Sequence, residues 1–588
     1  MITDYFADRP DMDYPSFNTL LRDVCARYPE NVALRMQVDD GFAEVSYRDL
    51  GLRVEAYGRA LEESGIAAGD HVGLLAENRA EWCVAYLAAV TRGVVIVPFD
   101  ILSSDETLEA YGRYADLKAI LFSEHFEERA AAIAAASRGC KILLHFDALS
   151  PEHRPSPVAR VAGARTVDLR ERFGSADAPL KAVEIAPDHP CSIIFTSGTT
   201  GSPKGVTLSH HGIIANINAS IMSLPIDEHD NFVTVLPLHH TYPTTCSFLS
   251  PISVGGSVTI VSKIVGPKII QATKETGGTI LIGVPLLFDK LRRGIHAKLR
   301  EQPVGKRALI ATMRGVSRAG TAFGLRLGRP LFRGLREAAG LSSLRLLVSG
   351  GGPLSPDSAS FFAELGFTIV QGYGMSENGP LITTNTIRHQ DNRSAGLPVK
   401  RTEIRIADPD EHGVGEIQVK SPSLMLGYYK NAEATEEIFT PDGFLRTGDL
   451  GCFDSRGYLF IRGRSKNLIV SPAGKNIFPE EIEVKFPEEG PVAEVLVLGQ
   501  RVAKGNDGER VVAVCYPDYE RIELDRGTRP AEAEIRALVE AQVAEVNKSL
   551  EPYKRIERVY LRDEEFEKTA SGKIKRFLYR EYAAPEAP

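Results

Sequence analysis

A loop rich in glycine and hydroxyl side chains offers the densest set of anion-binding groups in this sequence. The run SIIFTSGTTGSPKGVTLSHHG occupies residues 192–212 and begins as an apolar, strand-like stretch. Glycine lets backbone N–H groups approach an anion closely, and hydroxyls and a lysine add further donors. The residues concerned are Thr196, Ser197, Gly198, Thr199, Thr200, Gly201 and Lys204. They suit a polyphosphate, although a Walker A loop would need GxxxxGK followed by serine or threonine.

Two further glycine-rich segments each follow a strand-like run, namely SGGGPL at 349–354 and QGYGMSE at 371–377. Their glycines would leave a flat slot for a planar base, and Tyr373 offers a stacking face. Ser376 can bond a phosphate oxygen, and Glu377 is a hard oxygen ligand suited to Mg²⁺. The glycines are Gly350, Gly351, Gly352, Gly372 and Gly374.

Polar residues in two other motifs could bind a nucleotide or a metal. In FLRTGDL at 444–450, Asp449 can accept hydrogen bonds from both hydroxyls of a ribose. In LPLHHTY at 236–242, the adjacent His239 and His240 invite comparison with a metal site. Neighbouring residues of a strand point to opposite faces, so we expect a packed or pocket-lining imidazole rather than two ligands of one ion.

The elements that would position these motifs alternate between helix and strand. Helical periodicity is present at 49–64 and 80–92. This alternation is typical of a parallel, helix-covered sheet and predicts an α/β fold. The strand-like runs lie at 71–76, 94–100, 119–123, 141–146, 192–197, 231–237, 257–261, 279–285, 344–350 and 367–374.

The sequence pattern changes after about residue 396. From there, short strand-like runs joined by Gly, Pro and Asp turns predict antiparallel β structure. From about residue 478 a small α+β unit follows. We therefore predict a large N-terminal domain over 1–465 and a C-terminal domain over 466–588, with the boundary within residues 464–467.

Taken in order, these motifs resemble those of the acyl-adenylate-forming (AMP-binding) superfamily, which includes acyl-CoA synthetases, peptide-synthetase adenylation domains and luciferases. The resemblance covers nearly the whole chain. It implies ATP and Mg²⁺ as cofactors, a small β-barrel-like subdomain and a mobile C-terminal domain. It also implies that Glu377 binds the magnesium, that Asp449 binds the ribose, and that His240 lines the junction of the acyl and nucleotide sites. Ser376 stands where the family often has threonine.

The same resemblance assigns three residues near the predicted boundary and the C-terminus. Arg464 would contact ribose or phosphate, Lys466 would be the hinge between the domains, and Lys573, in KTASGKIK at 568–575, would be the catalytic lysine. The chemistry explains the need for a cation, because acyl-AMP formation brings a carboxylate onto the α-phosphate. A lysine that bridges both anions lowers the barrier.

The long-chain fatty acyl-CoA synthetase branch is the part of the superfamily that the chain resembles, and Gly474 matches the glycine that lines its pantetheine tunnel. We therefore expect an ATP-dependent fatty acid–CoA ligase for medium- to long-chain acids. The run RSAG at 393–396 departs from the family's usual GSVG, which weakens inference of chain length.

Three alternatives stay open. The chain could load an acyl-carrier protein in place of coenzyme A, or act on other carboxylates such as aryl acids. It could also be a non-catalytic or adenylate-only relative, which is disfavoured because Lys204, Glu377, Asp449 and Lys573 are all present.

Composition bears on the partners and the cellular compartment of the protein. A net charge of −8 argues against nucleic acid as a partner of the whole protein. The N-terminus has no signal-peptide pattern, no run of 18 apolar residues occurs, and the seven cysteines form no CxxC pair. These features predict a protein of the reducing cytoplasm.

One segment does not fit an acidic protein. Residues 292–336 hold twelve basic residues against a single acidic one, Glu301. On a helix, Arg307, Arg314 and Arg318 share one face, and Leu309, Met313, Val316 and Phe323 share the opposite one. This pattern is typical of an interfacial amphipathic helix whose cations face lipid headgroups, which would bring the segment into contact with a membrane. An ordinary surface hairpin that packs its apolar side on its own domain fits the pattern slightly better, and both interpretations stay open.

Overall fold

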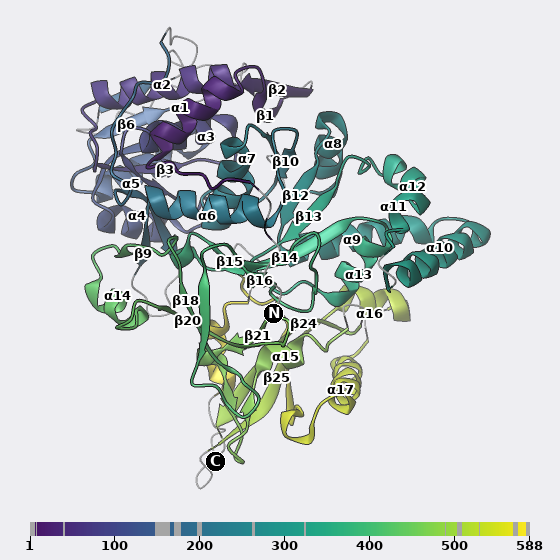
Figure 1. Cartoon of the computed structure of the whole chain (residues 1–588). Helices are drawn as coiled ribbons and strands as arrows, with labels where there is room; N and C mark the ends of the chain where they lie inside the picture. Colours follow the sequence, from purple (N-terminus) through teal and green to yellow (C-terminus); the bar gives the residue numbers. More distant parts are fainter. Residues whose placement is uncertain are drawn as a thin grey trace. The chain divides into compact units, whose positions relative to one another are not determined.

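The computed structural model describes residues 6, 9–38, 41–146, 165–169, 178–196, 203–261, 265–322, 325–487, 490–501, 508–528, 530–568 and 574–583. The chain forms two compact units (Figure 1). The larger unit comprises Met1–Ile404, Val419–Leu445 and Ser455–Tyr458, and the smaller comprises Arg405–Gln418, Arg446–Asp454 and Leu459–Pro588. The boundary predicted after residue 465 is the point about which the C-terminal domain would rotate. It stays a prediction.

The first sheet of the larger unit has nine strands in the order β16-β15-β14-β13-β12-β10-β11-β1-β2. Its central pairs are parallel, whereas β1 with β2, β14 with β15, and β15 with β16 are antiparallel. Four of the parallel strands are buried along their whole length, as expected for a parallel sheet that is covered on both faces. The strands are β1 Val32–Val38, β2 Gly41–Ser46, β10 Asn231–Thr234, β11 Ser257–Ile260, β12 Ile280–Gly283, β13 Leu346–Ser349, β14 Thr368–Gly374, β15 Leu381–Thr384 and β16 Leu397–Pro398.

The second sheet has eight strands in the order β19-β9-β8-β4-β3-β5-β6-β7. The strands from β8 to β7 are parallel, and β9 is antiparallel to both β8 and β19. The strands on either side of the glycine-rich segment, β8 and β9, therefore form an antiparallel pair. The strands are β3 His71–Leu75, β4 Val95–Pro98, β5 Leu117–Phe122, β6 Ile142–His145, β7 Arg165–Asp168, β8 Pro190–Thr196, β9 Lys204–Ser209 and β19 Gly427–Tyr428.

Helices cover the faces of both sheets (Figure 1), and the predicted helices at 49–64 and 80–92 are confirmed as α2 and α3. Every residue of α3 is buried, so it lies inside the core rather than on the surface. The helices of the larger unit are α1 Phe17–Arg27, α2 Tyr47–Glu63, α3 Ala80–Val90, α4 Asp105–Tyr114, α5 Glu127–Ala136, α6 His210–Ser223, α7 Ser250–Ser253, α8 Gly266–Thr276, α9 Pro285–Arg300, α10 Val304–Ala322, α11 Gly328–Leu331, α12 Arg333–Ala338, α13 Pro356–Glu364 and α14 Ala432–Ile438.

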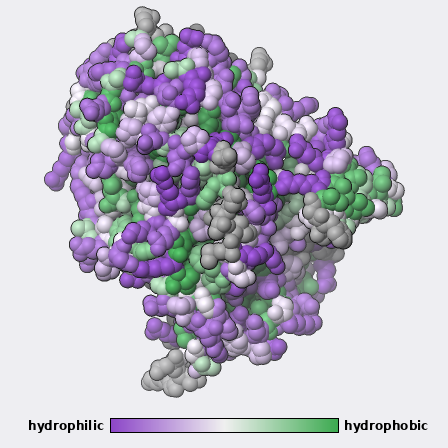
Figure 2. Space-filling view, in the orientation of Figure 1, coloured by the Kyte–Doolittle hydropathy of each residue, from purple (hydrophilic) through white to green (hydrophobic). Residues whose placement is uncertain are grey.

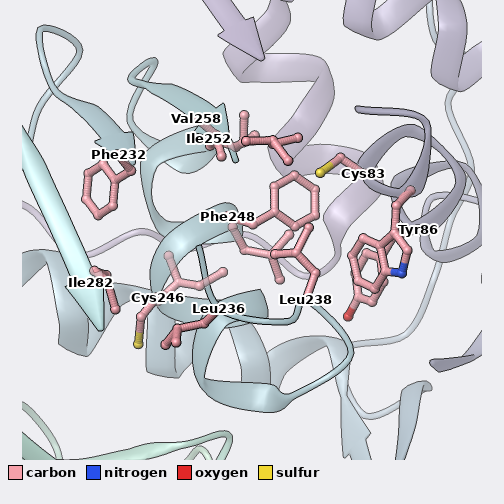
Figure 3. Packing of buried hydrophobic residues seen from close by; sticks show 14 of the residues in the cluster. Cys83, Tyr86, Phe232, Leu236, Leu238, Cys246, Phe248, Ile252, Val258 and Ile282 are labelled. Atoms are coloured by element: carbon pink, nitrogen blue, oxygen red, sulfur yellow. The ribbon is translucent and has the colours of Figure 1, made fainter. Parts of the chain in front are cut away.

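Aromatic packing joins α3 to the segment that follows the two histidines. Trp82 stacks on Tyr86 with ring centroids 5.4 Å apart, and Phe248 meets Tyr86 edge-on at 6.1 Å. Phe248 belongs to the π-helical turn Pro243–Leu249. Figure 3 shows it pointing into the apolar cluster with Leu238 and Tyr86. Burial of these rings fixes the backbone on the C-terminal side of His240.

The smaller unit holds most of a four-stranded sheet, ordered β17-β18-β20-β21, and a three-stranded sheet, ordered β24-β25-β26. The predicted α+β C-terminal unit is confirmed, and so is the α/β class with one large and one small domain. The elements are β17 Glu403–Ala407, β18 Gly415–Lys420, β20 Leu445–Phe453, β21 Leu459–Arg464, β22 Ile469–Val470, β23 Asn476–Ile477, β24 Val492–Arg501, β25 Glu509–Pro517, β26 Arg558–Leu561, α15 Pro479–Glu483, α16 Tyr519–Arg526 and α17 Glu532–Lys548. Among the described helices, none has both the length and the apolar character needed to cross a membrane.

Candidate active site

The hairpin β8–β9 carries the predicted phosphate loop. Thr196 and Lys204 are Cα partners at the end of the ladder, and the Thr196 hydroxyl donates to the Lys204 carbonyl at 3.4 Å. The pair closes the loop at its base. The remaining predicted residues of the loop lie outside the described residues; they are Ser197, Gly198, Thr199, Thr200 and Gly201.

Tyr428 joins the predicted lysine to the predicted carboxylate. Strand β19 pairs with β9, which sets Tyr428 opposite Val206. The Lys204 ammonium lies 4.7 Å from the centroid of the Tyr428 ring, and the Tyr428 hydroxyl donates to Glu377 Oε1 at 2.8 Å. One buried phenol thus positions a cation on its face and a carboxylate at its edge.

The phenol stays neutral. Burial raises the pKa of Tyr428 well above its usual range, and the neighbouring Glu377 carboxylate raises it further. Tyr428 therefore keeps its proton and remains a donor to Glu377. Sequence reasoning did not identify Tyr428, because no motif in the sequence marks it. In the structure Gly427, the residue before it, has a φ of +144°.

Glu377 lies in the 3-10 turn Ser376–Asn378, and several hydrogen bonds hold that turn. The Glu377 carbonyl accepts from the Met425 N–H at 2.9 Å. The buried Asn378 side chain donates to the Leu381 carbonyl at 2.8 Å and accepts from the Ser421 hydroxyl at 2.6 Å. The carboxylate is consequently presented by a fixed backbone, as a metal ligand or phosphate contact requires.

The predicted base slot consists of glycines that permit close packing. A Cβ at Gly374 would lie 2.1 Å from the Pro380 carbonyl oxygen, and one at Gly372 would lie 3.1 Å from the Thr383 carbonyl oxygen. A Cβ at Gly350 would lie 2.6 Å from the Tyr242 ring. These glycines therefore let β15 and Tyr242 approach, and Tyr373 is half-buried between Gly372 and Gly374. Gly351 and Gly352 follow in the same loop, and Gly351 has a φ of +81°.

The histidine pair lies in a turn, and not on a strand as predicted, because β10 ends at Thr234. The expectation that the two rings point to opposite faces is wrong: their centroids are 4.2 Å apart. His239 Nε2 lies 3.4 Å from Asp100 Oδ1. Burial lowers the pKa of both imidazoles, although the Asp100 carboxylate opposes this at His240. Both rings are therefore neutral near pH 7.

Asp100, His239 and His240 form a possible set of metal donors that sequence reasoning did not assemble. One ligand atom from each lies within 4.8 Å of the others. Among the described residues, neither Nε2 has a hydrogen-bond partner. Two neutral imidazoles and a carboxylate are the donors that zinc and similar cations accept.

In the smaller unit the two predicted ribose contacts lie together. Asp449 on β20 and Arg464 on β21 are Cα partners, and Arg464 Nε lies 2.8 Å from Asp449 Oδ1. Asp449 is buried and Arg464 is half-exposed. The guanidinium is thus fixed at the end of its strand, where it can still meet an anion.

The other predicted residues of the smaller unit lie in turns. Lys466 is the middle residue of the 3-10 turn Ser465–Asn467, which Asn467 anchors through a 2.7 Å bond to Glu480. Gly474 has a φ of +72° in the turn between β22 and β23, and a Cβ there would meet nothing within 4 Å. Glycine is favoured at this position because of the positive φ, and not because a side chain would collide with a neighbour. Lys573 lies outside the described residues, between the bridge partners Lys568 and Ile574.

Known proteins match this chain over most of its length. A family model described as "AMP-binding enzyme" matches residues 21–429. The long-chain-fatty-acid–CoA ligase heimdall of Drosophila melanogaster is 29% identical over 525 residues, which are 83% of this chain and 75% of that protein. A feruloyl-CoA synthase of an Amycolatopsis species is 27% identical over 496 residues, covering 83% and 87%. The chloroplastic long-chain-fatty-acid–acyl-carrier-protein ligase AEE15 of Arabidopsis thaliana is 25% identical over 562 residues, covering 85% and 76%.

Solved structures share the fold over almost the whole chain. The anthranilate CoA ligase AuaEII, in complex with anthranoyl-AMP, has a TM-score of 0.75 at 22% identity and covers 98% of both chains. ATP-bound MatB from Rhodopseudomonas palustris has a TM-score of 0.73 at 25% identity and covers 96% of this chain and 99% of its own.

Proposed function

Because the chain belongs to the AMP-binding enzyme family and is an acyl-adenylate-forming ligase, we propose that it is an ATP-dependent fatty acid–CoA ligase. In the first half-reaction the carboxylate oxygen of a medium- to long-chain acid bonds to the α-phosphorus of ATP, and pyrophosphate leaves. In the second, the thiolate of coenzyme A bonds to the acyl carbon, and AMP leaves. The observation that carries the proposal is the contact of Lys204 and Glu377 through Tyr428 at the base of the glycine-rich hairpin.

Each half of the nucleotide has proposed partners in this chain. The loop residues 197–201 and Lys204 would bind the phosphates, while Ser376 would bond a phosphate oxygen. Asp449 and Arg464 would bind the ribose, and Tyr373 would stack on the base between the glycine segments. Glu377 fits a magnesium ion that accompanies ATP, because it is a hard oxygen donor held by one hydrogen bond at Oε1. That ion would neutralise charge on the phosphates.

The remaining site residues serve the acyl group and the second half-reaction. His240 would line the entry of the acyl pocket, where its neutral imidazole adds no charge beside the carboxylate. Lys573 would bridge that carboxylate and the α-phosphate in the transition state. Gly474 would line the passage for pantetheine, and Lys466 would be the hinge between the two half-reactions.

A fatty acid is the favoured substrate because two of the relatives named above are long-chain fatty acid ligases. One is named for coenzyme A as the acyl acceptor and the other for an acyl-carrier protein. The relative named for an acyl-carrier protein makes that acceptor the second candidate.

The test supplies purified protein with ATP, Mg²⁺ and a panel of acids from acetate to oleate, together with ferulate and anthranilate. Coenzyme A and an acyl-carrier protein that bears phosphopantetheine are offered in separate arms. We expect thioester with coenzyme A for acids of medium and long chain. Thioester on the carrier protein alone would favour the second candidate, and activity confined to the aryl acids would overturn the fatty acid assignment.

A further inference from the structure

Helix α10, Val304–Ala322, exposes a broad side that carries no charge. At about 100° per residue, nine of its residues lie within one arc of about 160°. All nine are exposed, and Val304, Leu309 and Val316 are 77%, 59% and 47% exposed. We call this the uncharged face, and it consists of Val304, Gly305, Ala308, Leu309, Ala311, Thr312, Gly315, Val316 and Ala319.

Arginines on the side of α10 beyond this face tie the helix to the protein. Arg314 Nε lies 2.7 Å from Glu364 Oε2, and Arg318 Nε donates to Glu364 Oε1 at 2.6 Å. Glu364 ends helix α13 and is only 3% exposed. An ion pair to a buried carboxylate fixes the rotation of the helix about its axis. Met313, beyond the other edge of the uncharged face, also packs on the main core.

This orientation differs in part from both interpretations of the sequence. Arg314, 26% exposed, turns to Glu364 and leaves the cationic side that was predicted, whereas Arg318 pairs with Glu364 and still stays 70% exposed. The alternative, in which the apolar side packs on its own domain, is also wrong for Leu309 and Val316. Phe323 lies outside the described residues. A helix in water normally turns its apolar side towards the protein core. The reverse arrangement here indicates a surface that contacts something other than water.

Figure 2 shows the same feature from outside: apolar residues gather at the right-hand edge of the molecule, over the place of α10 in Figure 1. A single exposed leucine is ordinary, but a side of a five-turn helix without any charge is not. The uncharged face is about 22 Å long from Val304 to Ala319, at about 1.5 Å per residue.

Exposed cations flank the beginning of this face. Lys298 and Arg300 lie in the last turn of α9, and Lys306 and Arg307 lie in the first turn of α10. Among the described residues, Lys298 and Arg307 have no ion-pair partner. Lys306 donates to the neutral Gln302 side chain at 3.1 Å. The whole chain has a net charge of −8, so this local excess of cations is opposite in sign to the charge of the protein as a whole.

We propose that α10 docks the protein on a lipid surface that contains anionic headgroups. The uncharged face enters the boundary between headgroups and acyl chains, and Lys298, Lys306 and Arg307 bind the headgroups. Charge complementarity favours lipid over a second copy of this chain, because the 292–336 segment of a copy brings the same cations and a single acid, Glu301. The proposal does not depend on the proposed enzymatic function.

The experiment is co-sedimentation of the full chain with vesicles of phosphatidylcholine, alone or mixed with phosphatidylglycerol, at low and high salt. We expect binding to the anionic vesicles that weakens with salt. Leu309→Glu should weaken it at least tenfold, and Arg307→Gln about fivefold, since one cation near the surface is removed. Leu524→Glu is the matched control, because Leu524 is 84% exposed on α16.

A fluorescent variant gives an independent measurement. The chain has one tryptophan, and Trp82 is buried. Leu309→Trp should therefore report the environment of the uncharged face, with a blue shift on anionic vesicles. Absence of vesicle binding in every condition would overturn the proposal, as would binding that Leu309→Glu leaves unchanged. A dimer in sedimentation velocity that Leu309→Glu dissociates would assign the face to a second copy instead.

Discussion

At the scale of single residues, the site depends on a tyrosine that the motifs did not reveal. Lys204 and Glu377 were predicted from their own segments, but Tyr428, which touches both, lies 51 residues beyond Glu377. No local sequence pattern predicts the contact of Tyr428 with these two residues, because it forms only when β19 pairs with β9. The histidine pair shows the opposite failure: a local rule for strands was applied to residues that the chain places in a turn.

Tyr428→Phe tests this link. The change keeps the ring beneath Lys204 and removes the donor to Glu377. A hydrogen bond to a charged group contributes about 1.5–3 kcal/mol, so we expect acid-dependent ATP–pyrophosphate exchange to fall roughly ten- to a hundredfold. Tyr429→Phe is the control, because that hydroxyl binds Asp116 instead. Equal rates for Tyr428→Phe and wild type would show that the hydroxyl does not position Glu377.

His210 should make the protein sensitive to acid. Its imidazole is buried at the start of α6, where Nδ1 accepts from the Phe17 N–H at 3.3 Å, and burial lowers its pKa to about 3. The unfolded chain takes up a proton near pH 6.5 and the folded chain does not. Stability is therefore complete above pH 6.5 and is lost as the pH falls towards 3.

His210→Leu should remove up to about 1.4 kcal/mol per pH unit from the slope of unfolding free energy between roughly pH 6 and 4. Denaturant melts at several pH values measure this slope. His229→Leu is the control, since the His229 side chain is exposed. A slope that His210→Leu leaves at the wild-type value would contradict the burial of a neutral imidazole.

At the scale of elements, periodicity predicted most strands and helices of the larger unit. The strands at 71–76 and 257–261 are present within a residue as β3 and β11. Strand β9 was missed because its residues, KGVTLS, alternate too weakly beside so many loop-forming neighbours. The orientation of α10 could not be predicted either, because it is set by Glu364, a distant residue, and not by the helix's own pattern.

The 3-10 turn Ser465–Asn467 is the element on which the proposed hinge depends. Lys466→Pro fixes φ near −65° and restricts rotation there. If rotation at this residue separates the half-reactions, ATP–pyrophosphate exchange should survive better than acyl-CoA formation. Lys466→Ala removes the side chain and leaves the backbone free, so it should keep both. Wild-type acyl-CoA synthesis by Lys466→Pro would exclude a hinge at this residue.

At the scale of the whole molecule, two compact units divide the predicted residues. Lys204, Glu377 and His240 belong to the larger unit, whereas Asp449 and Lys573 belong to the smaller. The sequence instead assigned Asp449 to a domain over 1–465, and that boundary stays a prediction. The order of motifs could not predict the uncharged face of α10, because exposure is a property of the folded molecule.

Lys573→Ala should separate the tasks of the two half-reactions. Removal of a preorganised donor typically costs a factor of about 10² to 10³, and we expect that loss in acyl-AMP formation only. Supplied acyl-AMP and coenzyme A should still give thioester at nearly the wild-type rate. Lys575→Ala, whose side chain pairs with Glu567, is the matched control. An equal loss in both half-reactions would assign Lys573 a structural role.

The fate of the carboxyl oxygens shows whether this chain forms an acyl-adenylate. The purified protein receives palmitate with ¹⁸O in both carboxyl oxygens, together with ATP, Mg²⁺ and coenzyme A, and mass spectrometry follows AMP and acyl-CoA. If an acyl-adenylate forms, one labelled oxygen bonds to the α-phosphorus and stays there when the thiolate takes the acyl group. We expect one ¹⁸O in each AMP and one palmitoyl-CoA for each AMP. Unlabelled AMP, or ADP as the product, would contradict acyl-adenylate formation by this chain.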